Sequence, residues 1–576
     1  MSKNQEIADL FEEMADLLEL TGANAFRVNA TRKVARTLEE LPSDVGDMEN
    51  DPKQITAIDG IGAGSAKRII EYLQDDQIAD LEALRSEVPT GLIQVLGVPG
   101  LGPKTVATLW KEANVTGLES LRKAIDRGAL ESLPRMGKKT VDNIRQSLDF
   151  VAAASTRYRL DQAMQEAESI VASLSSTPGV NKITYAGSLR RGRDTVGDVD
   201  IIATTSKPDA LAERFTSLPE IAKVQAKGST KCSIRRTSGL QVDLRMFKNV
   251  GYGAALLHFT GSKEHNVVLR QRAIDRGQRL SEYGLFEEND GDEPRLLEAE
   301  SEENIYAALG LPWIPPPLRE DRGEFVDQLP TLIEIKDIRS DLHSHTTASD
   351  GKLSIEEMAK AAKKRGLKVL AITDHSRSSF QANGLDVDRL KAHIDAIHEV
   401  NDNIKGITLL AGSEVDIHAE GNLDYEDDIL AQLDIVVASP HMPVKQEPAA
   451  ATKRLIRAVS HPLVNILGHP TARLINRRAG LEPDMAAVVA AATDSNTALE
   501  INANPMRLDL RDTHARLAME GGCMISINTD AHGADQFDLL RYGIMTAQRG
   551  WVTADRCINT WTTAKLKKWI AAGRTS

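Results

Sequence analysis

The chain has little cysteine, few aromatic residues and no long hydrophobic run. Its three cysteines, Cys232, Cys523 and Cys557, are scattered through 576 residues without a CxxC spacing, which argues against a disulfide framework or a thiolate metal site. No apolar stretch reaches the ~18 residues that span a bilayer. The first twenty residues are acidic and amphipathic, unlike a signal peptide. We therefore expect a cytoplasmic protein without a membrane span.

An excess of positive charge is also absent. The formal net charge is -13, which argues against a surface that is basic throughout, although local clusters remain. The basic residues of these clusters are Arg190, Arg191, Arg193, Lys223, Lys227, Lys231, Arg235 and Arg236. The first three adjoin a catalytic-type motif. For the other five, a solvent-exposed surface without a function is as good an interpretation as a binding site. A chain of this length exceeds one hydrophobic core, so several domains are expected.

Histidines and acids follow short apolar runs from residue 341 to the end, in the fragments DLHSH, SDG, TDH, GSE, SPH, GHP and TDAH. Polar side chains repeated at strand ends predict an α/β barrel with a site at its C-terminal face. Mixed imidazole and carboxylate ligation favours two to three ions of Mn²⁺, Zn²⁺ or Fe²⁺, which can activate water against a phosphoester. The nine candidate ligands are His343, His345, Asp350, His375, Glu414, His441, His469, Asp530 and His532.

Other polar residues of this region are interpreted as structural. A lone histidine is more often a satisfied core or surface group than a ligand, which applies to His393, His398, His418, His461 and His514. The segment LEINANPMRLDL predicts a sixth strand, after which Asn502, Asn504 and Arg507 can contact a substrate phosphate. Loop capping is the favoured role for the two asparagines.

Two aspartates lie one residue apart in GDVDI, and a third stands in VDLRMF. The two-residue period of a strand puts Asp198 and Asp200 on one face, where Asp243 from another strand can join them. Three carboxylates without a histidine favour Mg²⁺, and a pair of Mg²⁺ ions stabilises both oxygens of a phosphoryl transfer. A D-x-D pair alone is usually a surface feature, but the combination G-S-x(9)-D-x-D is more specific. Its Gly187 and Ser188 end a strand and can hold a triphosphate.

Three N-terminal segments share an apolar residue, a tight turn and a helix start. They read IDGIGAGSAKRI, VPGLGPKTVATL and LPRMGKKTVDNI, and the third is degenerate. Glycine permits close backbone approach, and the N–H groups of the following helix can hold a phosphate oxygen. The pattern resembles the helix–hairpin–helix motif, which binds the DNA backbone without reading sequence. The DNA-binding residues that we expect are Gly60, Gly62, Gly100 and Gly102.

The order of GSLRRG, GDVDI, VDLRMF, HFTGS and N-x-x-x-R resembles the nucleotidyltransferase superfamily and, within it, the family X DNA polymerases similar to polymerase beta. The resemblance spans about residues 1–317. It implies that Asp198, Asp200 and Asp243 are catalytic and bind two Mg²⁺ ions. It also implies that eight further residues hold the incoming dNTP and the template. These residues are Gly187, Ser188, Arg191, His258, Phe259, Gly261, Asn266 and Arg270.

Two positions depart from the vertebrate members of that family. His258 stands where they have a tyrosine beside the sugar, so discrimination against ribonucleotides is in question. Arg68 stands where they carry a Schiff-base lysine, with Lys67 beside it. An arginine stays protonated and cannot form that adduct. Lys67 is an alternative nucleophile for that adduct, and deoxyribose-phosphate lyase activity is not assumed.

The nine ligands downstream resemble the PHP (polymerase and histidinol phosphatase) domain, a distorted barrel of seven strands, over about residues 335–576. In bacterial and archaeal family X polymerases that domain is associated with metal-dependent 3′–5′ exonuclease activity and with action on abasic sites. The fold class implied is multidomain α+β and α/β. The expected domains are a helical DNA-binding region (1–90), fingers (91–150), palm (151–245), thumb (246–317), a linker (318–334) and the PHP barrel (335–576). The stretch 311–324, which is proline-rich and then charged, predicts a semi-rigid linker.

The leading hypothesis is a monomeric repair polymerase that fills short gaps in DNA from dNTPs and trims 3′ ends. In two alternatives the barrel is a structural module or a small-molecule phosphatase. The first is disfavoured because nine converging polar groups are costly to bury without a metal. A template-independent nucleotidyltransferase is a further alternative, but such an enzyme has no need of the hairpins or of the Asn266–Arg270 segment.

Overall fold

The structure is a computed structural model that describes residues 3–573, except 42–44, 49–51, 59, 76, 97, 99–100, 132, 134–135, 139, 143, 146–147, 149–156 and 289–293. The chain forms two compact units, one of residues 1–156 with 476–478 and one of residues 157–475 with 479–576. Among the described residues, every helix is too short or too polar to cross a membrane.

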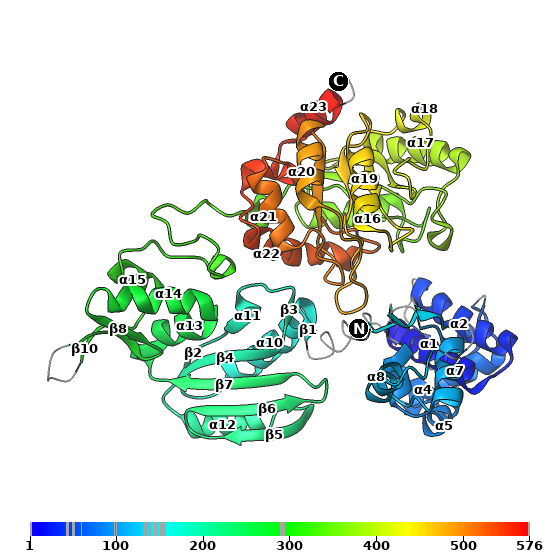
Figure 1. The fold of residues 1–576 in the computed structure, drawn as a ribbon. Coiled ribbons are helices and arrows are strands. Elements are labelled where there is room, and N and C mark those ends of the chain that lie inside the picture. Colours follow the sequence, from blue (N-terminus) through cyan, green and yellow to red (C-terminus); the bar gives the residue numbers. More distant parts are fainter. Residues whose placement is uncertain are drawn as a thin grey trace. The chain divides into compact units, whose positions relative to one another are not determined.

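The first unit is built from helices in its described part (Figure 1). Apolar residues recur along the first helix, where Ile7, Phe11, Met14 and Leu18 are all buried. Their spacing of three or four residues puts them on one helical face, which packs into the core of the unit. The elements are α1 (Lys3–Thr21), α2 (Ala25–Glu40), η1 (Val45–Met48), α3 (Pro52–Thr56), α4 (Ala63–Asp75), α5 (Ala79–Glu87), α6 (Gly91–Leu96), α7 (Pro103–Ala113) and α8 (Leu118–Asp126).

The second unit begins with a five-stranded sheet in the order β2-β4-β7-β6-β5. Strands β4 and β7 are parallel neighbours, and the other adjacent pairs are antiparallel. Every second residue of β4 and β7 contributes to the core on one face of the sheet: Val199, Ile201, Ala203, Val242, Leu244 and Met246. The elements are β1 (Tyr158–Arg159), α10 (Leu160–Ser175), β2 (Val180–Tyr185), α11 (Gly187–Arg190), β3 (Thr195–Val196), β4 (Asp198–Thr205), α12 (Pro208–Thr216), β5 (Ile221–Lys227), β6 (Lys231–Arg236) and β7 (Gln241–Phe247).

A smaller region of helices and a three-stranded antiparallel sheet, β10-β9-β8, follows. Its elements are η2 (Asn249–Gly251), α13 (Tyr252–Thr260), α14 (Lys263–Ile274), β8 (Gln278–Ser281), β9 (Gly284–Glu287), β10 (Arg295–Glu298), α15 (Glu302–Ala308) and η3 (Pro316–Leu318). The proline-rich segment is part of this core, since Ile314, Leu318 and Arg319 are buried. The first residues of the segment predicted to be a semi-rigid linker are thus packed into this core.

A buried ion cluster joins α11 to this region. Glu302, 4% exposed, accepts hydrogen bonds from Arg190 at 2.7 and 2.8 Å and from Arg319 at 2.6 Å. Burial raises the pKa of Glu302, but Arg319 and Arg190 outweigh it and hold that pKa at about 2. Both guanidinium groups would lose their counter-charge if this carboxylate were neutral.

We therefore expect Glu302→Gln to lower the free energy of unfolding by about 3–5 kcal/mol, the cost of leaving buried charge uncompensated. Urea denaturation at neutral pH measures the change. Glu303→Gln, at an exposed position on the same helix, is the matched control. An equal effect of the two substitutions would contradict this role for the cluster.

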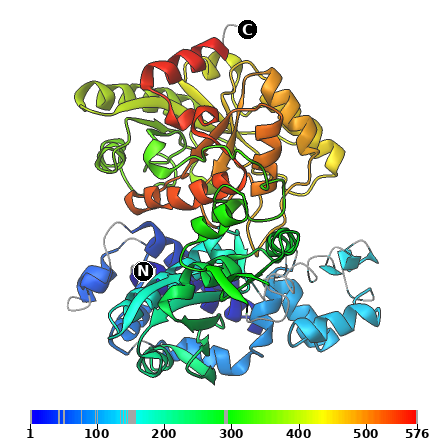
Figure 2. The same ribbon diagram turned by 90° about the vertical axis from the view of Figure 1, so that its left-hand side faces the viewer.

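The C-terminal part is a barrel of seven parallel strands in sequence order, β11 to β17, with helices around it (Figure 2). A bridge from Ser344 to Ala531 links the ends of the first and last strands. The strands are β11 (Ser340–Asp341), β12 (Val369–Ile372), β13 (Thr408–Asp416), β14 (Ile435–Ser439), β15 (Ile466–Leu467), β16 (Ala498–Asn502) and β17 (Ile525–Asn528). Segment 499–510 does supply the sixth strand, as predicted.

Helices and short 3₁₀ turns fill the intervals between these strands and cover the barrel. They are η4 (Ile335–Asp337), α16 (Ile355–Lys364), η5 (Phe380–Ala382), α17 (Val387–Asn403), α18 (Asp427–Leu430), α19 (Pro448–Val459), α20 (Met485–Asp494), α21 (Asp512–Glu520), η6 (Ala534–Leu539), α22 (Leu540–Arg549), η7 (Ala554–Arg556), η8 (Ile558–Thr560) and α23 (Thr563–Gly573).

Candidate active sites

The predicted ligands of the barrel gather at the C-terminal ends of its strands. The parallel pairing of β11 to β17 brings together ligands that are 187 positions apart in the sequence, as in the pair His343–Asp530, with Nε2 3.6 Å from Oδ1. Among the described residues, three groups of side chains are close enough to share an ion. The groups are His345, Asp350, His375 and His532; His343, His345 and Asp530; and His375, Glu414 and His441.

Glu414 lies at the centre of the site. Its Oε1 is 2.8 Å from His469 Nε2 and 3.2 Å from His441 Nε2. Its Oε2 is 2.9 Å from His375 Nδ1 and 3.4 Å from His343 Nε2. One carboxylate with imidazoles on both oxygens has the arrangement expected of a ligand that bridges two cations.

Asp350 forms a second centre beside the first. Its carboxylate lies 3.5 Å from His375 Nε2, 3.3 Å from His532 Nε2 and 3.9 Å from His345 Nδ1. His345 also approaches Asp530, with Nε2 3.0 Å from Oδ1. His345 and His375 therefore connect the two centres, and all nine predicted ligands belong to one continuous cluster.

Orphaned polar atoms test whether metals fit this cluster. Six atoms of the site are buried and make no hydrogen bond to another described residue: Nε2 of His343, both ring nitrogens of His345, Nδ1 of His375, Oε2 of Glu414 and Nδ1 of His469. A buried donor or acceptor that is left without a hydrogen bond costs about 1–3 kcal/mol of folding free energy. Imidazole nitrogens and carboxylate oxygens that face one another in this way suit divalent cations, so the residues fit the predicted metals.

Two acids that were not predicted hold the ligand histidines in place. Glu500 Oε1 lies 2.8 Å from His343 Nδ1, and its Oε2 accepts the His469 backbone N–H at 2.8 Å. Asp416 pairs with His441 Nδ1. Such partners fix the ring orientation and leave Nε2 for a metal. The two-residue period of a strand was a usable signal, because Asp416 follows Glu414 and Glu500 precedes Asn502 in that way.

The carboxylates and imidazoles of the cluster shift one another's pKa values strongly. Burial raises the pKa of Glu414, but His441, His343 and His375 outweigh it and lower that pKa well below its usual range. The pKa of His345 is lowered by burial and by the neighbouring rings of His532 and His375. Burial is outweighed by nearby carboxylates, which raise the pKa of His343, His375, His441 and His532, so a bound metal would take the place of protons on these rings.

Four of the five remaining histidines of the barrel lie beside a carboxylate outside the ligand cluster. His393 Nε2 lies 2.7 Å from Asp374 Oδ2, and His461 lies 3.1 Å from Asp427. His398 lies 3.6 Å from Asp434, and His418 lies 3.4 Å from Asp424. Burial lowers the pKa of His514 to about 4. None of the five belongs to the groups of close metal-type side chains found among the described residues.

The loop after β16 lies beside the cluster. Asn502 Nδ2 donates to Asp530 Oδ2 at 3.1 Å, and Arg507 Nε lies 4.0 Å from the same carboxylate. Asn504 Oδ1 accepts the Met506 backbone N–H at 3.0 Å, which is loop capping. A phosphate contact of Arg507 stays a prediction.

The palm carboxylates come from two adjacent strands. Asp198 and Asp200 lie on β4, and the parallel register places Asp243 of β7 beside Asp200. Asp243 Oδ2 lies 2.8 Å from Lys231 Nζ, while Asp200 Oδ1 is 3.8 Å from Arg245 Nε. The two cations counter part of the acid charge.

The electrostatics of the three acids favour added positive charge. Burial and the charge of Asp198 raise the pKa of Asp200 to about 6. The three oxygen donors, close together and incompletely neutralised, therefore suit the hard cation that the sequence predicts. Lys231 and Arg245 were not assigned to this site, because only the strand register shows which residues flank the acids.

A raised pKa has a consequence for stability. The folded protein binds the Asp200 proton more tightly than the unfolded chain, so this stabilising contribution is present below about pH 4 and lost as pH rises through about 6. We expect Asp200→Asn to raise the free energy of unfolding of the metal-free protein by about 2 kcal/mol at about pH 7.5, and by little at about pH 4. Chemical denaturation in a chelator measures this.

Two controls accompany that measurement. Asp209→Asn, at an exposed position on α12, should change stability equally little at both pH values. Added Mg²⁺ should stabilise the wild type more than Asp200→Asn, because the substitution removes a ligand. A destabilised Asp200→Asn protein at the higher pH would contradict the burial argument.

A cavity of about 490 Å³ opens beside Asp198. It is lined by Arg157, Ser188, Arg191, Arg193, Gly197, Asp198, Glu264 and Glu320. Gly187 has φ of +63°, and a Cβ there would lie 3.1 Å from Asp200 Oδ2, so glycine is needed where the loop meets the acids. Arg191 Nε donates to Glu320 Oε1 at 3.0 Å. Arg157 and Arg193 were not predicted and add positive charge to the cavity expected to hold the triphosphate.

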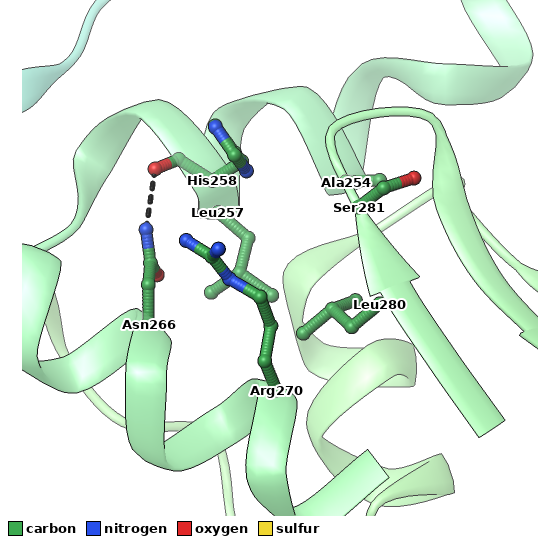
Figure 3. A pocket seen from close by; sticks show the side chains of 7 residues that line it. All are labelled: Ala254, Leu257, His258, Asn266, Arg270, Leu280 and Ser281. Carbon is green, nitrogen blue, oxygen red and sulfur yellow. Dashed lines mark hydrogen bonds between the residues drawn. The ribbon is translucent and has the colours of Figure 1, made fainter. Parts of the chain in front are cut away.

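A second, small cavity lies between α13, α14 and β8 (Figure 3). His258, Asn266 and Arg270 line it, and Asn266 Nδ2 donates to the His258 carbonyl at 2.7 Å. Phe259 packs against the His258 ring with centroids 4.8 Å apart. Burial lowers the pKa of His258, which keeps the ring neutral at neutral pH. The predicted sugar and base contacts are thus neighbours in space. Gly261, at φ +67°, caps α13.

The predicted hairpins lie in the first unit. Helix α4 follows Gly62, and α7 follows Gly102, its N-cap. Gly60 has φ of +91°, and a Cβ there would lie 2.7 Å from Thr37 Oγ1. Gly100 and parts of the third segment lie outside the described residues. Arg68, at the position of the lyase lysine, is paired with Asp80 through Nε (2.8 Å) and NH2 (2.5 Å).

Comparison with known proteins finds four family descriptions along the chain. Residues 2–78 match a helix-hairpin-helix domain, and residues 92–149 match a SAM-like helix-hairpin-helix tandem. Residues 255–320 match the DNA polymerase beta thumb, and residues 341–504 match the PHP domain.

Curated relatives cover the whole chain or its parts. The chain is 40% identical over 560 residues to the DNA polymerase/3'-5' exonuclease PolX of Bacillus subtilis (strain 168), covering 96% of this chain and 97% of that protein. It is 31% identical to a probable phosphatase of Thermoanaerobacter sp. (strain X514), over 40% of this chain and 93% of that protein. DNA polymerase lambda of Arabidopsis thaliana is 24% identical, over 54% of this chain and 61% of that protein. Similarity along nearly the full length of both proteins, together with the thumb and PHP matches, shows that the chain belongs to the PolX family, the family X DNA polymerase/3'-5' exonucleases with a PHP domain.

Proposed function

We propose that this polymerase/exonuclease fills short gaps in DNA during base excision repair, with synthesis at the palm acids and removal of 3′ nucleotides at the barrel. The observation that carries the proposal is the presence of two complete and chemically different ligand sets in one chain. One set is oxygen-only, around Asp200, and the other is mixed imidazole and carboxylate, around Glu414. Incision at abasic sites by the barrel is part of the same proposal.

In the palm, Asp198, Asp200 and Asp243 would hold two Mg²⁺ ions, which supply charge stabilisation for phosphoryl transfer when bound. Arg157, Arg191 and Arg193 line the adjoining cavity and bind the triphosphate of the dNTP there. His258 and Phe259 orient the sugar, and the Asn266 hydrogen bond to the His258 carbonyl keeps the two helices in register. These side chains bring the primer end and the dNTP to one place.

In the barrel, the nine ligands would hold two to three ions of Mn²⁺ or Zn²⁺, which supply Lewis-acid chemistry on a phosphodiester. Glu500 and Asp416 hold the Nδ1 protons of His343 and His441, so each ring presents Nε2 to the site. Burial of His343, His345, Glu414 and His469 strengthens these interactions, while the exposed Asp350 leaves the site open to a substrate.

For the whole chain we propose a cytoplasmic monomer that binds gapped or primer–template DNA. The glycine turns before α4 and α7 hold the duplex through its phosphates, with Gly62 and Gly102 at the helix starts. Deoxyribose-phosphate lyase activity is not part of the proposal, because Arg68 stays charged and is engaged with Asp80.

The gap-filling proposal is tested with a series of substrates. Incorporation of one nucleotide is measured on an open primer–template and on gaps of one to five nucleotides, with and without a downstream 5′ phosphate. We expect the phosphorylated short gap to be filled about tenfold more efficiently, the effect of one charge-assisted phosphate contact. Equal efficiency of incorporation on the open primer–template and on the short gap would contradict a gap-repair role. Incision is tested on a duplex with an abasic site analogue, and absence of cleavage there would remove incision from the proposal.

A second candidate for the barrel is hydrolysis of small phosphate esters, favoured by the 31% identity to the probable phosphatase. Turnover of sugar phosphates is compared with that of an oligonucleotide. Efficient hydrolysis of the small esters, without shortening of DNA, would favour this candidate over the exonuclease.

A further inference from the structure

Two large apolar side chains stand in solvent beside the metal ligands of the barrel. Phe380 is 86% exposed and Met442 is 71% exposed, and from residue 341 to 573 they are the exposed large apolar residues that the structure describes. The other large apolar side chains of this region are buried or half-buried. Each of the two follows a ligand closely in the chain, Phe380 five residues after His375 and Met442 directly after His441.

The loop that carries Phe380 is closed and anchored. Ser376 bridges to Leu385 at its base, and the Leu385 N–H donates to the His375 carbonyl at 2.8 Å. A Cβ on Gly384 would lie 2.0 Å from the Ser376 carbonyl oxygen, so the two sides of the loop are in close contact. Phe380 is thus displayed from a fixed backbone rather than from a loose chain.

Asp416 ties this loop to the loop of Met442. Its Oδ2 accepts hydrogen bonds from the hydroxyls of Ser378 (2.5 Å) and Ser379 (2.9 Å), and its Oδ1 contacts His441 Nδ1. The Met442 backbone is fixed from below, because the buried Arg454 donates to its carbonyl at 2.8 Å. Both exposed side chains are therefore held at the edge of the site, next to one ligand.

The surroundings of the pair are positively charged in part. Arg377 reaches Asp424 at 3.3 Å, with its own side chain 48% exposed. Lys445 is exposed three residues after Met442. Exposed aromatic surface beside cationic groups, continuous with a phosphodiesterase site, matches the chemistry of unpaired nucleic acid, whose bases stack while its phosphates are neutralised.

We propose that Phe380 and Met442 form a stacking platform for the unpaired bases at the 3′ end of a DNA strand, which positions the terminal phosphodiester at the barrel ligands. The inference rests on the proposal that the barrel is the exonuclease site. The platform would select the substrate, because the unpaired bases of a DNA strand contact Phe380 and Met442, whereas a small ester reaches the ligands without touching them. Phe380 and Met442 are positioning residues here, since they would touch bases and not the reacting atoms.

The test compares two substrates on the full chain with Mn²⁺, a single-stranded oligonucleotide and the small chromogenic diester bis(p-nitrophenyl) phosphate. We expect Phe380→Ala to lower kcat/KM for the oligonucleotide about tenfold, mainly through KM, and to leave diester hydrolysis unchanged. Phe380→Trp should retain oligonucleotide activity, and Met442→Ala should show a smaller loss. Ile335→Ala, an exposed apolar position of the same part of the chain, is the matched control.

A second readout needs no turnover. An oligonucleotide with 2-aminopurine at its 3′ end, mixed with the protein in a chelator, should lose fluorescence on binding to wild type and to Phe380→Trp but not to Phe380→Ala. Unchanged oligonucleotide cleavage by Phe380→Ala, or an equal loss on both substrates, would overturn the platform. A wild type that hydrolyses the diester without shortening DNA would instead contradict the exonuclease assignment of the barrel.

Discussion

Replacing Asp200 with alanine is expected to lower the rate of nucleotide incorporation about a thousandfold, because the loss of several kcal/mol of charge stabilisation in the transition state has an effect of that size. Asp200 neighbours Asp243 across β4 and β7 and is the acid of the palm whose ionisation its surroundings oppose most, with a pKa of about 6. Single-turnover extension of a 5′-labelled primer measures the change.

The same variant should shorten 3′ ends at the wild-type rate, since the ligands of the barrel are untouched. Asp209→Ala, on the exposed side of α12, should retain both activities and controls for loss of charge alone. Incorporation by Asp200→Ala within tenfold of wild type would mean that synthesis does not depend on the palm acids.

The second large effect is expected at Glu414. Glu414→Gln keeps the size of the side chain but removes the charge that faces His343, His375, His441 and His469. A neutral amide is a poor bridging ligand, so we expect 3′–5′ shortening to fall about a thousandfold while incorporation on a matched primer is retained. Release of labelled mononucleotide measures the exonuclease.

Metal binding gives an independent check of that variant. Wild type should hold two to three equivalents of Mn²⁺ beyond those of the palm, and Glu414→Gln should hold fewer, as measured by metal analysis after gel filtration. Glu399→Gln, at an exposed position on α17, is the matched control. Full exonuclease activity in Glu414→Gln would show that the cluster around this residue is not the nuclease site.

Local sequence patterns were sufficient to predict much of this architecture. The two-residue period of strands placed Asp198 with Asp200, and apolar runs that end in histidine or acid predicted an α/β barrel with ligands at its strand ends. The resemblance to the PHP domain implied its seven strands. The matches to the thumb, hairpin and PHP descriptions and the relationship to PolX confirm the family, the fold class and both enzymatic activities. These patterns are readable because each depends on residues close together in the chain.

Features that depend on distant residues were not predictable in the same way. The run from Lys223 to Arg236 contains no acid, yet Lys227 pairs with Glu213, and Arg236 with Glu166 and Glu220. Glu500 was within a predicted strand, but its contact with His343 depends on how the seven strands close into a barrel. Strand register and ring closure, rather than local pattern, decide which side chains meet.

The central claim, that one chain carries two independent sites acting on the same DNA, is tested most directly with a gapped substrate whose 5′-labelled primer ends in a mismatch. The account predicts that Asp200→Ala only shortens the primer, that Glu414→Gln stalls at the mismatch, and that an equimolar mixture of the two variants excises the mismatch and fills the gap as the wild type does. If either variant alone lost both shortening and extension, or if the mixture failed to complete the product, the two activities would not reside in separate sites.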